Sequence, residues 1–129
     1  MDGSDKINEI TNRIIGAALK VHTRLGPGLL EHTYRRCLAH EIRKSAMKVE
    51  EEVILDLVYD DLLVVGAYRL DLLVEDSVVI EIKATEKLHQ VHHDQVITYL
   101  RIGRKPLGLL INFHADRLTN GLKRFVNNL

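Results

Sequence analysis

The spacing of apolar residues predicts two helices at the start of the chain. Across residues 7–25, Ile, Ala, Val and Leu recur every three or four positions, which is the stripe of an amphipathic helix. Gly26-Pro27-Gly28 ends this helix, because proline removes a donor and disfavours helix in the residue before it. A second stripe with a four-residue repeat predicts a helix over residues 29–44.

The period then changes to two, which predicts three strands. Residues 53–59 alternate between two faces and are rich in β-branched side chains. A turn at Asp60-Asp61 leads into a longer strand over residues 62–75. After a second turn at Asp76-Ser77, residues 78–83 are mostly apolar on both faces, which is typical of a central strand covered by helices.

The last third of the chain continues with a helix and a strand. Helical spacing returns over residues 88–102, and an apolar run over residues 107–113 predicts a further buried strand. Residues 118–129 fit either a short helix or a strand. The order of elements predicts the α/β class in its α+β form, a mixed sheet flanked by helices.

Length and composition indicate one folded domain over residues 1–129. The chain has 129 residues, of which 46% are hydrophobic, so it has enough apolar surface to form a core. Cys37 is the only cysteine, so we expect neither an internal disulfide nor a Cys-rich zinc site, and a reducing cytoplasm is the expected compartment. We expect no membrane span and no signal peptide, because the sequence has neither a long apolar run nor a basic start followed by an apolar segment.

The balance of charge gives no general attraction to nucleic acid. The 18 Lys and Arg residues equal the 18 Asp and Glu residues, so any contact with a phosphate backbone must rest on a local site. Basic residues do cluster on the second helix, after the third helix and near the C-terminus. Two interpretations stay open: ordinary mixed surface charge, or one basic face for a phosphate backbone opposite an acidic edge.

Three ionisable residues are expected to converge on one patch of the sheet. Asp71 lies late in one strand and Glu81 lies in its hairpin partner, so the tight turn between them brings the two carboxylates close. Glu81 and Lys83 are two positions apart and therefore share a face. The patch is either a surface ladder of salt bridges or a cation site, because buried charges need pairing or a metal.

The second interpretation specifies a chemistry. Two carboxylates and a main-chain carbonyl suit a hard cation such as Mg²⁺, which keeps waters and phosphate oxygens in its shell. A lysine beside the cation can orient or deprotonate a metal-activated water and stabilise charge that builds on a phosphate.

The same residues resemble the PD-(D/E)xK nuclease superfamily, whose pattern is an Asp, a strand turn and then Glu-x-Lys on a central strand. Leu70 precedes Asp71 where the strict pattern has proline. Residues 28–34, Gly-Leu-Leu-Glu-His-Thr-Tyr, match the G-x-x-E-x-x-Y pattern that names a family of small proteins within this superfamily. Later signatures of that family are similar to residues 68–74, 81–84, 92–95 with 99–100, and 108–113, so the resemblance covers most of the chain.

The resemblance implies a restriction-endonuclease-like αβββαβ core with an additional N-terminal helix. It implies a Mg²⁺ or Mn²⁺ ion held by Asp71 and Glu81, with Glu31 as a third carboxylate, and Lys83 as the catalytic lysine. Glu31 also has a local explanation, since a carboxylate at a helix N-terminus is favoured by the helix dipole.

Four further residues are expected to border this site. The resemblance places Gln95 and Tyr99 on a helix beside it, and their spacing from His92 puts all three on one helix face. Tyr34 belongs to the apolar stripe of the second helix, so core packing is our preferred interpretation for its ring, with its hydroxyl as a candidate to reach the site.

Two functions from different classes follow. The first is a nuclease-like protein that hydrolyses phosphodiesters in DNA or RNA with a Mg²⁺- or Mn²⁺-activated water. The second is a catalytically silent nuclease fold that acts as a binding or assembly module. The small size leaves no inserted domain for recognition, so we expect a homo-oligomer of even order and no membrane partner.

Overall fold

The computed structural model describes residues 3–128. Two helices, α1 (Gly3–Leu25) and α2 (Glu31–Lys44), precede three strands, β1 (Val49–Tyr59), β2 (Leu62–Val74) and β3 (Val78–Lys83). They are followed by α3 (Gln90–Gly103), β4 (Leu107–Asn112), a short 3₁₀ helix, η1 (Leu118–Gly121), and β5 (Leu122–Val126). The segment from α2 to β4 has the predicted αβββαβ order, and α1 is the additional N-terminal helix. The undecided C-terminal segment contains both a short helix and a strand.

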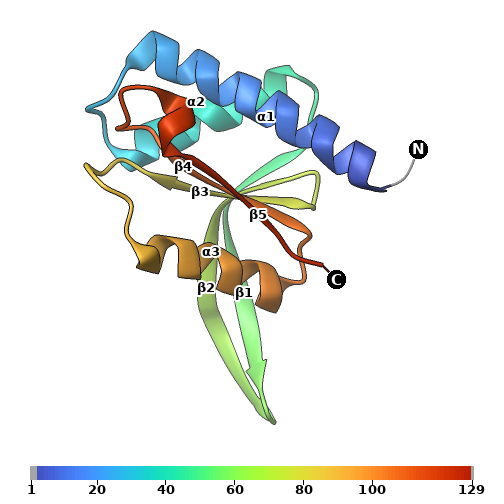
Figure 1. Cartoon of the computed structure of the whole chain (residues 1–129). Helices are drawn as coiled ribbons and strands as arrows, with labels where there is room; N and C mark the ends of the chain where they lie inside the picture. The colour runs from blue at the N-terminus through green and yellow to red at the C-terminus, as the bar shows by residue number, and fades with distance from the viewer. Residues whose placement is uncertain (1–2, 129) are drawn as a thin grey trace.

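The five strands form one mixed sheet in the order β1-β2-β3-β4-β5. β3 and β4 are parallel, whereas the other neighbouring strands are antiparallel. Figure 1 shows α1 and α2 on one face of this sheet and α3 on the other. β3 is buried along nearly its whole length, as predicted for a strand with helices on both sides.

Each face of the sheet has its own apolar cluster. On one face, α1 and α2 bury the predicted stripes against β3 and β4, with Ile14, Leu38 and Ile80 fully buried. On the other, Val96 and Leu100 of α3 pack against strand residues. Burial of both faces by helix stripes of period 3.6 explains why the sheet's central strands are apolar on both sides.

Some boundaries differ from those predicted. The second helix begins at Glu31, because Leu30 is extended and Gly28 has a φ of +109°, a value that L side chains rarely adopt. β1 begins at Val49, before the alternating segment, because the acidic run at residues 50–52 lies alongside β2 from the pair Val49↔Val74 onward. Pairing with a neighbouring strand therefore extends a strand beyond its apolar pattern.

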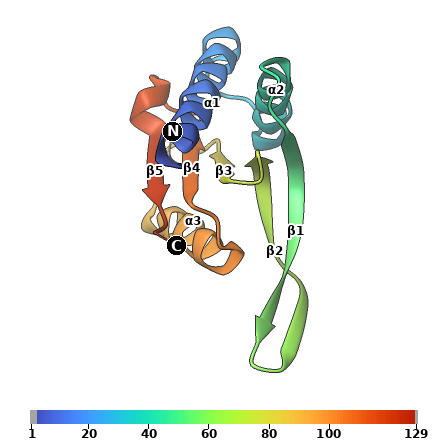
Figure 2. The ribbon, with the colours of Figure 1, turned by 90° about the vertical axis from the view of Figure 1, so that its right-hand side faces the viewer.

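The β1–β2 hairpin extends beyond the helices. Its distal half projects from the rest of the molecule in two perpendicular views (Figures 1 and 2). The register shifts between Leu55 and Leu57, where Gly66 has a φ of +65° and donates its N–H to Asp56 Oδ1 at 2.8 Å. None of the helices within residues 3–128 is long and apolar enough to cross a membrane.

Candidate metal centre

Asp71 and Glu81 lie at the point where β2 and β3 stop pairing. The ladder between these strands runs from Val74↔Val78 to Leu72↔Ile80. Beyond it, Asp71 Oδ2 accepts a hydrogen bond from the Ile82 N–H at 2.8 Å, and Glu81 Oε1 accepts one from the Asp71 N–H at 3.3 Å. Each carboxylate thus takes a main-chain donor left by the diverging strands, and the two acidic side chains are linked reciprocally.

The environment of Glu81 disfavours its negative charge. Glu81 is only 2% exposed, although it carries an ionisable group. Burial, followed by the nearby Asp71 charge, raises the pKa of Glu81 to about 8, while the Asp71 N–H and the Lys83 charge partly oppose this shift. Glu81 therefore keeps its proton near neutral pH when no divalent ion is bound beside it.

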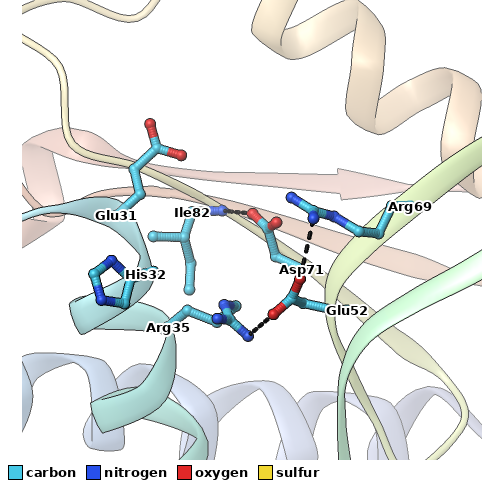
Figure 3. A pocket seen from close by; sticks show the side chains of 7 residues that line it. All are labelled: Glu31, His32, Arg35, Glu52, Arg69, Asp71 and Ile82. Atoms are coloured by element: carbon cyan, nitrogen blue, oxygen red, sulfur yellow. Dashed lines mark hydrogen bonds and ion pairs between the residues drawn. The ribbon is translucent and has the colours of Figure 1, made fainter.

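A first cavity of about 320 Å³ lies beside Asp71 (Figure 3). Glu31 lines this cavity from the first turn of α2, together with Asp71 from β2. Within residues 3–128, however, no group of three or more His, Cys, Asp or Glu side chains lies close enough to hold a metal. The structure brings Glu31 to the same cavity as Asp71, and the three-carboxylate ligand set stays a prediction.

Two arginines, which the sequence alone did not assign to the site, flank Asp71 in the first cavity. Arg35 Nη1 lies 2.8 Å from Glu52 Oε1, and Arg69 Nη1 lies 3.0 Å from Glu52 Oε2 (Figure 3). Glu52 has a φ of +51°, which is uncommon for a residue with a side chain. The sequence does contain one indication that Arg35 belongs to the site: it follows Glu31 by four positions and therefore shares its helix face.

A second cavity, of about 380 Å³, contains the predicted lysine and helix residues. It is lined by Lys83 of β3 and by His92, Gln95 and Tyr99 of α3, among others. Gln95 Nε2 donates a hydrogen bond to the Tyr99 hydroxyl at 3.0 Å. The three helix residues therefore share a face, as their spacing predicts, and that face is turned toward Lys83.

The pKa of His92 depends on charged residues of both cavities. Its Nδ1 accepts a hydrogen bond from the His89 N–H at 3.1 Å, so the neutral imidazole carries its proton on Nε2. Desolvation lowers the pKa of His92, the Lys83, His89 and His93 charges lower it further, and Glu31 opposes them. Residues from both cavities thus act on the same imidazole.

Tyr34 lies in the core and lines neither cavity. Its ring stacks on Phe113 with centroids 4.6 Å apart, and it is fully buried. Its hydroxyl donates to the Gly26 carbonyl and accepts a hydrogen bond from the Leu29 N–H at 3.1 Å. Tyr34 therefore ties down the loop before α2, which sets the position of the helix turn that contains Glu31.

A buried asparagine secures the segment after Lys83. Asn112, opposite Lys83 in the β3–β4 pair, is 5% exposed. Its Oδ1 accepts a hydrogen bond from the Thr85 N–H at 3.1 Å, and its Nδ2 donates to the Thr85 carbonyl at 2.8 Å. These bonds replace strand pairing where β3 ends and hold the chain beside the catalytic candidate.

The family described as the PD-(D/E)XK nuclease superfamily matches residues 8–125. The chain belongs to the PD-(D/E)XK nuclease superfamily. Neither the curated proteins nor the solved structures give a significant match to the chain. Membership indicates a nuclease-like protein, and it agrees with the restriction-endonuclease-like arrangement of the sheet and helices. Assignment to the narrower family named for G-x-x-E-x-x-Y stays a prediction.

Proposed function

We propose that this superfamily member hydrolyses phosphodiester bonds in DNA or RNA with the help of Mg²⁺ or Mn²⁺. The observation that supports this proposal is the linked pair Asp71 and Glu81, in which a buried carboxyl has a pKa of about 8 beside a second carboxylate. Two crowded acidic groups destabilise each other without a cation, whereas a divalent ion would stabilise both in their ionised form.

The donor set fits such an ion. Asp71 and Glu81 would hold it, and Glu31 would approach from α2 as a further oxygen donor. When bound, the ion would polarise the phosphate and lower the pKa of a water. Lys83 would orient that water and stabilise the charge that develops on the phosphate, because it shares the face of Glu81 two positions away.

Residues on either side would bind and orient the substrate. Arg35 and Arg69 present guanidinium groups in the cavity that Asp71 lines, and arginine forks suit the paired oxygens of a phosphate. Gln95 and Tyr99 offer polar groups in the cavity that contains Lys83. The two arginines share this cavity with the carboxylates of Glu31, Glu52 and Asp71, so phosphate binding there would depend on the bound cation as well.

A Mn²⁺ titration followed by calorimetry, combined with a cleavage assay, tests the proposal. We expect wild-type protein to bind Mn²⁺ and to cleave single-stranded, duplex or branched substrates, and Asp71→Asn to lose both properties. Lys83→Ala should keep the ion but lose cleavage by about 10²-fold or more. Asp116→Asn and Lys87→Ala change exposed residues of the same types and serve as matched controls. A Lys83→Ala protein that cleaves as well as wild type would contradict the proposal.

The alternative is a nuclease fold without catalysis that acts as a binding or assembly module. The observation that favours it is the exposed apolar surface of the β1–β2 hairpin, because such surface is typical of interaction sites. The same titration separates the two functions: a protein that binds no Mn²⁺ and cleaves none of the substrates supports the module.

A further inference from the structure

Glu52 occupies the two arginines that line the first cavity. Its Oε1 lies 2.8 Å from Arg35 Nη1 and its Oε2 lies 3.0 Å from Arg69 Nη1, so one carboxylate spans guanidinium groups from α2 and β2 (Figure 3). A phosphate group can bridge two guanidinium groups in the same way, through two of its oxygens. Glu52 therefore takes the contacts that a phosphate would need in this cavity.

The backbone of β1 brings Glu52 to this cavity. The ladder pairs on either side place Glu52 opposite Asp71 in the register of β1 and β2. Residues opposed in this way are neighbours on a sheet, and both carboxylates line the cavity. Glu52 has a φ of +51°, and backbone conformations that are unfavourable for a residue with a side chain are concentrated at ligand sites. The position of Glu52 is thus that of a residue with a role in binding.

Arg35 has a second carboxylate that holds it in place. Its Nη1 also lies 3.3 Å from Glu51 Oε1, and the Arg35 side chain is only 13% exposed. Glu51 is 15% exposed and is bound in turn by Arg43 Nη1 at 3.1 Å. The Glu52 side chain, by contrast, is 44% exposed. If Glu52 moved away, Arg35 would keep a buried partner, and the Glu52 carboxylate would be hydrated by solvent that it already contacts.

We propose that Glu52 is an internal competitor of the substrate phosphate: it neutralises Arg35 and Arg69 in the free protein and is displaced when a phosphodiester binds. This inference rests on the phosphate-binding role proposed above for the two arginines, and it adds a residue that limits their affinity. With Glu52 in place, three carboxylates face two guanidinium groups in the cavity, so an incoming phosphate meets excess negative charge. Displacement of Glu52 balances these charges before the charge of a bound cation is added.

Two other roles for Glu52 lead to different results when its charge is removed. If Glu52 served to orient the arginines, its loss would weaken phosphate binding, because the guanidinium groups would no longer be held toward the cavity. If Glu52 only repelled phosphate through its charge, its loss would strengthen binding by the same factor with or without Arg69. Displacement predicts stronger binding that depends on Arg69, so the sign and the coupling of the effect separate the three roles.

Fluorescence anisotropy with labelled single-stranded DNA and RNA of one sequence tests the sign of the effect. The titrations contain Ca²⁺, which binds oxygen ligands as Mg²⁺ does, and are repeated in a chelator, where metal-dependent cleavage cannot occur. We expect Glu52→Gln to lower the dissociation constant for at least one strand roughly 3- to 10-fold, since two partly exposed ion pairs no longer compete. Glu50→Gln removes the same charge from a side chain 43% exposed on the same strand and should change the constant less than about 2-fold. Unchanged, weaker or undetectable binding by Glu52→Gln, or an equal gain from Glu50→Gln, would overturn the proposal.

A double-mutant cycle with Arg69→Gln tests the coupling. Arg69 has a side chain that is 56% exposed, and circular dichroism confirms that each variant is folded. In the Arg69→Gln background, the gain from Glu52→Gln should fall to about 2-fold or less, because one of the released contacts is missing. The same gain in both backgrounds overturns the displacement. A coupled gain in a protein that does not cleave with Mn²⁺ refutes the nuclease function and keeps the displacement, whereas cleavage without a coupled gain refutes the displacement alone.

Discussion

Replacing Glu81 with glutamine should make the protein more stable at neutral and alkaline pH. The substitution keeps the size of the side chain and a carbonyl oxygen that accepts the Asp71 N–H, but it removes the acidic proton. Wild type must either hold that proton or place a negative charge in a site that is 2% exposed beside Asp71. Glu81→Gln has neither the acidic proton nor the buried negative charge.

The size of the effect follows from the two protonation equilibria of Glu81. Its pKa is about 8 in the folded protein, against an ordinary value of 4.5. Between these values the folded protein binds one more proton than the unfolded chain, so the free energy of unfolding falls as pH rises, by ~1.4 kcal/mol for each pH unit. Over the whole interval between the two pKa values, the loss of unfolding free energy is at most on the order of 5 kcal/mol. Below the ordinary value both states are protonated, and the contribution disappears.

Urea unfolding in the presence of a chelator measures this difference. Between about pH 5 and pH 8, we expect wild type to lose on the order of 3 kcal/mol more stability than Glu81→Gln. Glu86→Gln, which changes an exposed glutamate, should follow the wild-type profile. If wild type and Glu81→Gln keep a constant difference across this range, the raised pKa of the buried carboxyl at position 81 is refuted. Mn²⁺ added at about pH 8 should stabilise wild type and not the variant.

Three other substitutions, each measured by urea unfolding, test the contacts that hold the site and the core in place. Asn112→Ala leaves the Thr85 N–H and carbonyl without their partner and should cost about 2–4 kcal/mol; a cost near zero would contradict that support. Tyr34→Phe keeps the ring but loses two hydrogen bonds of the hydroxyl, so a loss of about 1–2 kcal/mol is expected, and an unchanged midpoint would show that the loop does not need them. Gly108→Ala would place its Cβ 2.7 Å from Val96 Cγ1 and should cost about 1–3 kcal/mol, whereas a stabilised variant would show that α3 moves freely away from β4.

The order of the elements and the pairing of Asp71 with Glu81 could be predicted from the sequence. Apolar spacing reports which face of a helix or strand is buried, and the type of each element follows directly from that spacing. A short turn at Asp76-Ser77 determines its own hairpin, so two residues ten positions apart are brought together by local geometry. The same reasoning predicted the shared helix face of His92, Gln95 and Tyr99.

Only the tertiary structure decided what surrounds these residues. Arg35, Glu52 and Arg69 come from α2, β1 and β2, and they meet beside Asp71 through packing between elements distant in sequence and through the positive φ of Glu52. The exposure of the hairpin is also non-local. Alternation over residues 53–59 predicts one buried face, but whether a helix reaches that face depends on where α3 lies. Periodicity encodes a preference for burial, whereas the element that covers a given face comes from the rest of the fold.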